Sequence, residues 1–223
     1  MHDLLPFLPE SINNVLSSIP YFMPEIYLAI LFIVVLVTDL LFSRDALKLC
    51  RIIACAGILL VIHRDYQQFD LLLFTAEPNG HFFFTQMLLL TPVAINFKFI
   101  IDVLAFILLL YFAWDDKLNA HPKGLADLYS IIVGSVFGLH LMTMAANLLS
   151  VYLAIEMVSI ASYLMVAYRS ESAFSTEAGL KYVLFGAAAS AVIWSESMLP
   201  ATARAANSTI PSRKCAPVVR DGS

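Results

Sequence analysis

Long apolar runs separated by short polar segments dominate the hydrophobic pattern of this 223-residue chain. Most runs are close to 20 residues long, and a helix of about 20 residues crosses the roughly 30 Å hydrocarbon core of a bilayer. The pattern therefore predicts an all-α membrane protein with about six transmembrane helices, of which the last is short or incomplete. The predicted spans are residues 21–42, 47–62, 94–114 (or from 99), 125–145, 148–168 and 177–192.

The segment 67–96 breaks this pattern. Its two apolar runs, LLLF and HFFFTQMLLL, flank the tripeptide Pro78-Asn79-Gly80, and each run is too short for a membrane helix. Short apolar runs on either side of such a turn signal are typical of paired strands. We therefore predict a small extramembrane hairpin near 67–96.

The two ends of the chain differ from the spans between them. Residues 1–20 form an amphipathic lead-in, in which three prolines prevent a long helix. Residues 193–223 carry charges and three further prolines without apolar periodicity, which predicts a disordered tail.

Composition supports a membrane protein and excludes several other classes. The chain is 60% hydrophobic and only 13% charged, and a soluble domain has about twice that share of charged residues. Its net charge of -4 comes with no basic run, so nucleic-acid binding is not expected. The cysteines Cys50, Cys55 and Cys215 have neither CxxC nor paired-histidine spacing, so they predict no metal site and no disulfide framework.

Glu156 is the first candidate functional residue, because it lies near the middle of the apolar run 148–168. An ionised carboxylate at that depth costs on the order of 3 kcal/mol and usually marks an ion or proton pathway. Tyr152 lies four residues before Glu156, and Ser159 and Tyr163 lie three and seven residues after it. The helical period therefore places all three on the same helix face as Glu156. We predict that this stripe is a proton path.

Two further candidates come from neighbouring spans. Lys181 lies about five residues into the run 177–192 and is offset from Glu156 by roughly 10 Å along the membrane normal, so we expect coupling through water. His140, in GSVFGLHLMTM, has an intrinsic proton affinity suited to proton transfer and is a possible member of the path. Asp102 falls toward the end of its span and is expected at the membrane interface.

The stretch 127–192 resembles a known family. The matching features are Asp127 and Tyr129 at the start of one helix, the LLSVYLAIEMVS run with its central acid, the exit SYLMVAYR, and EAGLKYVLFGAAASA. Together they resemble the antiporter-like membrane subunits of NADH:quinone oxidoreductase, respiratory complex I, and its subunit N (mitochondrial subunit 2) most closely. The resemblance covers roughly residues 20–192, and the sequence is expected to depart from the family after Val192.

The resemblance implies a domain layout and a role. Residues 21–124 would hold the first three transmembrane helices and the hairpin, and residues 125–192 would begin the proton-translocation repeat. It implies that Glu156 is the acid of the fifth helix and Lys181 the lysine of the sixth, in a subunit of an NADH:quinone oxidoreductase whose quinone reduction drives proton pumping.

The implied partners are the other membrane and peripheral subunits of the complex. No GxGxxG, Walker motif or cysteine cluster is present, so NADH, FMN, iron–sulfur clusters and quinone are expected in those subunits and not in this chain. The expected location is the bacterial inner membrane, with the mitochondrial inner or thylakoid membrane as the alternative. Basic residues are concentrated after the odd-numbered spans, which places the N-terminus on the outer side.

Two other interpretations remain open from the sequence. The chain could be a subunit of the related multi-subunit cation/proton antiporters, which would carry sodium. It could also be a truncated or frame-shifted fragment that inserts into the membrane without pumping, which the unusual tail after Val192 suggests.

Overall fold

The chain is helical almost throughout, apart from one small hairpin, in a computed structural model that describes residues 7–42, 46–74, 80–114, 126–168 and 173–198. It divides into two compact units, residues 1–179 and residues 180–223, which are described separately. The helices are α1 (Phe7–Ser18), the 3-10 helix η2 (Ile19–Phe22), α2 (Met23–Leu41), α3 (Ala46–Phe74), α4 (Pro92–Trp114), α6 (Ala126–Met144), α7 (Leu148–Ala167) and α8 (Ala173–Met198).

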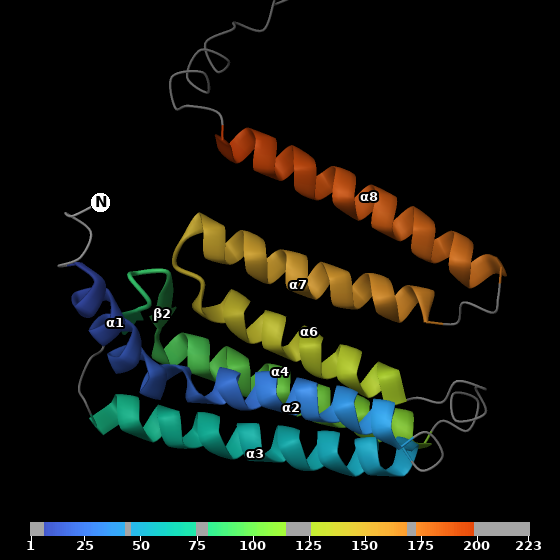
Figure 1. Cartoon of the computed structure of the whole chain (residues 1–223), viewed down its shortest axis with the longest axis horizontal. Helices are drawn as coiled ribbons and strands as arrows, with labels where there is room; N and C mark the ends of the chain where they lie inside the picture. Colours follow the sequence, from blue (N-terminus) through green and yellow to red (C-terminus); the bar gives the residue numbers. More distant parts are fainter. Residues whose placement is uncertain (1–6, 43–45, 75–79, 115–125, 169–172, 199–223) are drawn as a thin grey trace, which may run out of the picture. The chain divides into compact units, whose positions relative to one another are not determined.

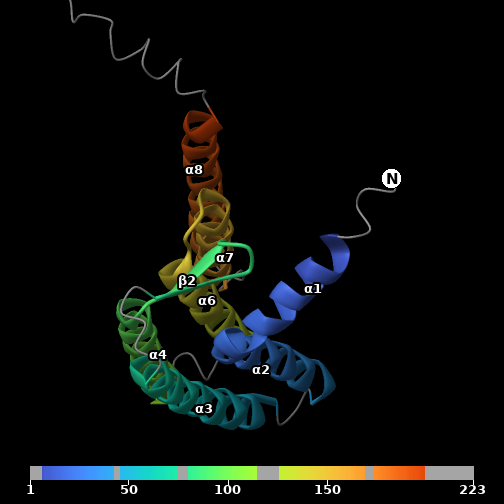
Figure 2. The same cartoon turned by 90° about the vertical axis from the view of Figure 1, so that its left-hand side faces the viewer.

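A four-helix bundle of α2, α3, α4 and α6 forms the centre of the first unit, and α7 packs against α6 (Figures 1 and 2). Aliphatic side chains fill the bundle, because each helix turns its small and branched residues inward. The fully buried members include Leu28 and Val35 of α2, Ile58 of α3, Leu109 of α4 and Val133 of α6.

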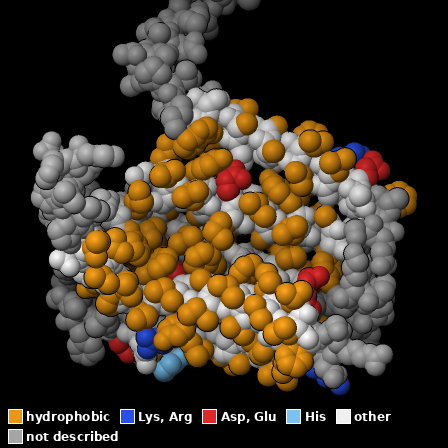
Figure 3. Space-filling model, viewed as in Figure 1, with side chains coloured by type: hydrophobic (Ala, Val, Ile, Leu, Met, Phe, Trp, Pro, Cys, Tyr) orange, Lys and Arg blue, Asp and Glu red, His pale blue; other side chains and the backbone are white. Residues whose placement is uncertain are grey.

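Five helical stretches among the described residues are long and apolar enough to cross a membrane: residues 15–41, 92–112, 127–144, 148–167 and 174–195. Many of their large apolar side chains are exposed outside the bundle, and hydrophobic side chains cover much of the visible face of the described helices (Figure 3). Helices also satisfy their own backbone hydrogen bonds, as a bilayer requires. The predicted class, an all-α membrane protein, is confirmed.

Helix α3 is much longer than predicted. The sequence placed its end at Ile62, before His63-Arg64-Asp65, but the helix continues to Phe74 and includes the LLLF run that was expected to be a strand. The polar residues continue the helix because they pair within it: Arg64 Nη1 donates to Gln67 Oε1 over 2.8 Å, and Gln67 Nε2 lies 3.1 Å from His63 Nε2.

The hairpin is present but smaller than predicted. Strands β1 (His81–Phe83) and β2 (Leu88–Leu90) pair antiparallel, with Phe82 opposite Leu89. The hairpin turns at residues 84–86, which all have positive φ. Pro78 and Asn79, in the tripeptide that was expected to form the turn, lie outside the described residues. The hairpin is held at one end of the bundle, because β2 contacts α6 and the Phe84 amide donates to Ser18 Oγ over 3.3 Å.

Helix α8 is longer than the 16-residue final span that the sequence predicted. It runs from Ala173 to Met198, so the helix includes residues 193–198, which were assigned to the disordered tail. The run Ile193-Trp194 continues the apolar pattern, and Ser195 satisfies its hydroxyl by donating to the Val192 carbonyl over 2.8 Å. The remainder of the predicted tail, residues 199–223, lies outside the described residues.

Close approach of α6 and α7 depends on Gly138. A Cβ atom at this position would lie 2.9 Å from Val158 Cγ2 and 3.2 Å from the Val158 amide nitrogen. We expect Gly138→Ala to lower the free energy of unfolding by about 1–2 kcal/mol, since overpacking outweighs the gain of about 1 kcal/mol in helix propensity. Denaturant unfolding in mixed micelles measures this change.

Gly134→Ala is the matched control for this prediction, because Gly134 lies on the same helix and its added methyl would meet only ring carbons of Phe32, at 3.3 Å and beyond. The Phe32 ring is partly buried and can move, so this variant should be as stable as the wild type or more stable. Equal losses in both variants would contradict the proposed contact.

Candidate functional site

Five ionisable side chains converge inside the four-helix bundle. Each is completely buried: Glu25 on α2, Asp65 on α3, Lys98 and Asp102 on α4, and His140 on α6. Burying a charge without a partner costs several kcal/mol, so these groups must be understood from their mutual contacts.

Glu25 and Lys98 form an ion pair. Lys98 Nζ lies 2.5 Å from Glu25 Oε1, and both side chains are inaccessible to solvent. Glu25 follows Pro24 in the first turn of α2, where the helix dipole also favours an anion. The pair therefore fixes one negative and one positive charge at this end of the bundle.

His140 connects two carboxylates. Its Nε2 lies 3.0 Å from Asp102 Oδ1, and its Nδ1 lies 3.5 Å from Glu25 Oε1. A neutral imidazole donates from only one ring nitrogen. Both contacts are therefore favourable together when the ring is an imidazolium, or when Asp102 holds the proton and donates it to Nε2.

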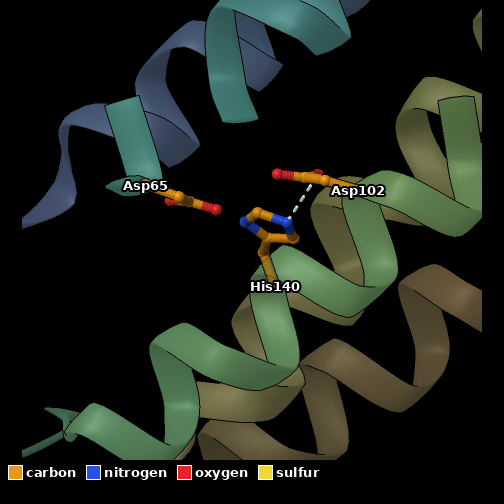
Figure 4. Close-up of side chains that lie close together, drawn as sticks. All are labelled: Asp65, Asp102 and His140. Carbon is orange, nitrogen blue, oxygen red and sulfur yellow. Dashed lines mark hydrogen bonds and ion pairs between the residues drawn. The ribbon is translucent and has the colours of Figure 1, made fainter. Parts of the chain in front are cut away.

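Asp65 completes the cluster. Figure 4 shows its carboxylate pointing toward the His140 ring and Asp102. One polar atom from each of these three residues lies within 4.8 Å of the other two. Neither Asp65 oxygen has a hydrogen-bond partner among the residues that the structure describes. Asp65 is therefore the member of the cluster whose charge has no direct compensation there.

A metal ion could in principle use Asp65, Asp102 and His140, because carboxylates and imidazole are common ligands. However, both ring nitrogens of His140 already face carboxylate oxygens, at 3.0 and 3.5 Å. Coordination would require one of these contacts to break and would add a cation beside the Lys98 ammonium. The arrangement is a chain of hydrogen bonds and ion pairs rather than a ligand set.

Sequence reasoning missed most of this cluster. Asp102 was expected toward a span end, at the membrane interface, but α4 begins at Pro92, so Asp102 lies near the middle of the helix. Its side chain is completely buried against His140. Lys98 was not among the candidate residues, and a span was predicted to end at Ile62, before Asp65. The available signal was the spacing of Lys98 and Asp102, which lie four residues apart on one face of an apolar helix.

The candidate proton path on α7 lies on a different surface. The described helix is continuous over Tyr152, Glu156, Ser159 and Tyr163, and all four side chains are half-buried. The buried residues Ala154 and Ala161 mark the side that packs on α6.

At about 100° per residue, Glu156 lies roughly 140–160° around the helix from both buried alanines. The stripe thus faces away from the four-helix bundle, and His140 belongs to the buried cluster instead of this stripe.

Lys181 lies on α8 with an exposed side chain. Lys181 belongs to the second compact unit, whereas Glu156 belongs to the first, and each unit is described separately. The water-mediated coupling of Lys181 to Glu156 therefore stays a prediction. The first residues of α8 do contact α7 within the first unit, where Ser175 Oγ donates to the Val166 carbonyl over 3.0 Å.

The region that contains α7 and α8 matches a known family model. Residues 145–198 match the transmembrane family of the NADH:quinone oxidoreductase and Mrp antiporter subunits. The match continues past Val192 and ends at Met198, where α8 also ends. The match therefore extends six residues beyond Val192, after which the sequence was expected to depart from the family.

Curated relatives agree with this match. NADH-quinone oxidoreductase subunit N of Chlorobium chlorochromatii is 28% identical over 79% of this chain and 33% of the relative. Subunit N 2 of Chloroherpeton thalassium is 32% identical over 82% of this chain and 35% of the relative. Subunit N of Anaeromyxobacter sp. is 30% identical over 86% of this chain and 35% of the relative.

The chain spans about a third of the length of these relatives. The similarity nevertheless extends over about four fifths of the chain itself, and the family model includes Glu156. By these matches the chain is a subunit N-like protein, and its residues 145–198 resemble the transmembrane family of NADH:quinone oxidoreductase and Mrp antiporter subunits.

Proposed function

We propose that this chain is a membrane subunit of the proton-pumping NADH:quinone oxidoreductase and forms part of a proton channel that quinone reduction drives. The observation that carries the proposal is the single acid, Glu156, near the middle of a membrane-length helix inside the family match. An acid at this depth serves an ion or proton pathway more often than a structural role.

Glu156 is the proton-transfer group in this proposal. Its carboxylate accepts a proton from one side of the membrane and releases it toward the other, and its side chain is half-buried. The hydroxyl groups of Tyr152, Ser159 and Tyr163 share its side of α7 and can relay protons, since each is both a donor and an acceptor.

Lys181 is the second proton-transfer residue of the proposal, coupled to Glu156 through water. An ammonium near a buried carboxylate favours the ionised form of that carboxylate, and movement of the positive charge reverses this preference. Changes in the charge of Lys181 would thereby promote the release or the binding of a proton by Glu156.

The redox chemistry belongs to partner subunits in this proposal. NADH, FMN, the iron–sulfur clusters and quinone are bound there, and this chain contributes to the translocase as a membrane component. The names of the relatives support membership of an oxidoreductase complex. The proposed location is the bacterial inner membrane, with the N-terminus on the outer side.

A cation/proton antiporter subunit is the second candidate function, because the matching family model describes Mrp antiporters together with the oxidoreductase. The two functions differ in the transported ion. Proton transport by the oxidoreductase should proceed without sodium, whereas an antiporter exchanges sodium for protons.

Affinity purification tests the proposed membership. We expect the tagged full-length chain, solubilised from its native membrane, to co-purify with NADH-dependent quinone reductase activity and with flavin. The matched control is an equally tagged, unrelated membrane protein from the same cells. Purification without reductase activity, together with sodium-dependent proton movement in vesicles, would contradict the oxidoreductase assignment and favour the antiporter.

A further inference from the structure

We infer that Asp65 is a second proton-binding residue, reached through a pocket between α3 and α4 and separate from the stripe on α7. The inference rests on the buried cluster of Glu25, Asp65, Lys98, Asp102 and His140. It goes beyond the proposed function, because the cluster would bind its proton whether or not Glu156 takes part in pumping.

Charge balance is the first observation. With every carboxyl ionised and His140 neutral, three negative charges face one ammonium, and two negative charges remain uncompensated in a fully buried space. These groups come from every helix of the bundle: Glu25 from α2, Asp65 from α3, Lys98 and Asp102 from α4, and His140 from α6. Two bound protons make the cluster neutral.

The contacts show where the two protons belong. Glu25 is held by the Lys98 ammonium, and the pair of His140 and Asp102 holds one proton between Nε2 and Oδ1. Asp65 has no such partner, and both of its oxygens are buried without a hydrogen bond within the described ranges. A carboxyl group in this position avoids an uncompensated charge by binding the second proton itself.

A route for that proton lies beside Asp65. A pocket of about 180 Å³ is lined by Asp65, Tyr66, Phe69, Ile95, Asn96 and Phe99. Since a water molecule occupies about 30 Å³ of liquid, the pocket has room for several, and the Asn96 amide supplies a polar partner for them. The Asp65 oxygens are inaccessible to solvent, so a lining side chain must move before pocket water reaches them. The aromatic residues keep the remainder of the pocket apolar.

The proposed step is a simple proton exchange. An acid in the pocket, such as hydronium, transfers its proton to an Asp65 oxygen, so that one O–H bond forms on the carboxyl and the conjugate base remains in the pocket. The reverse step returns the proton. His140 and Asp102 lie within 4.8 Å of Asp65, close enough for the cluster to respond to the change in charge.

This site is independent of Glu156 in position. The stripe that includes Glu156 faces away from α6, whereas His140 faces α2 and α4 from within the bundle. A failure of Glu156 to support pumping would therefore leave the assignment of Asp65 intact, and the two can be tested separately.

Infrared spectroscopy of the full 223-residue chain in lipid nanodiscs tests the inference. We expect the wild type to show a carbonyl-stretch band of a protonated carboxyl group that shifts in heavy water, and Asp65→Asn to lose this band. Asp70→Asn on the same helix is the matched control and should keep it. Asp65→Glu should retain a protonated carboxyl band at a shifted position.

Thermal stability is the second readout. Asparagine has nearly the shape of a protonated aspartate without its charge, so Asp65→Asn should unfold within the temperature range of the Asp70→Asn control. An unchanged carboxyl spectrum in Asp65→Asn would overturn the inference. So would a metal ion bound stoichiometrically to the wild type and lost from Asp65→Asn in elemental analysis.

Discussion

Lys98→Met is expected to lower the free energy of unfolding by about 3–5 kcal/mol, the usual cost of removing one partner from a buried ion pair. The Glu25 carboxylate is completely buried against the Lys98 ammonium, so the variant would leave a negative charge without its main partner. Methionine fills a volume similar to that of the lysine side chain, so lost packing contributes little. Equilibrium unfolding in mixed micelles, followed by circular dichroism, measures the loss.

Two controls separate the ion pair from other effects. Lys48→Met replaces an exposed lysine on α3 and should change the stability by less than about 0.5 kcal/mol. The double variant Glu25→Gln/Lys98→Met removes both charges and should recover a substantial part of the lost stability. A double variant less stable than Lys98→Met would contradict the pairing of these two residues.

Glu156→Gln has the second large expected effect. In the complete subunit within its assembled complex, we expect it to slow proton pumping on the order of 10²-fold, the lower end of what a positioned proton-transfer group contributes. Glutamine keeps the size of the side chain but cannot accept and release a proton. Acidification of proteoliposomes after NADH addition measures the rate.

Ser162→Ala is the matched control for Glu156→Gln. Ser162 lies on the same helix, and its hydroxyl donates to the Ser159 carbonyl over 2.7 Å rather than to another helix. This variant should pump at the wild-type rate. Equal loss in both variants would show that α7 is sensitive to any change, and the special role of Glu156 would be refuted.

Most of the helices could be predicted because their signals are local. The predicted span 148–168 agrees within one residue with α7, where Asn147 caps the helix by accepting from the Leu149 amide over 3.0 Å. The end of α3 was wrong because polar residues stop a membrane span but do not stop a helix. The local pattern of His63-Arg64-Asp65 indicates that the apolar span ends, but it does not indicate that the helix continues.

The candidate site residues also include some that the sequence could predict and others that it could not. Glu156 could be found because one apolar run contains it and no other acid. The cluster around His140 could not, since Glu25, Asp65 and Asp102 come from three different helices and lie near the ends of their predicted spans. Only the packing of α2, α3, α4 and α6 brings them together, and periodicity carries no information about which helices pack.

The number of protons pumped for each NADH oxidised is the most direct test of the proton-channel assignment. Both quantities can be recorded in the same proteoliposomes that contain the assembled complex with wild-type subunit, Glu156→Gln or Ser162→Ala. The account predicts a lower ratio for Glu156→Gln and the wild-type ratio for Ser162→Ala. A wild-type ratio for Glu156→Gln in a fully assembled complex would contradict a proton path through α7.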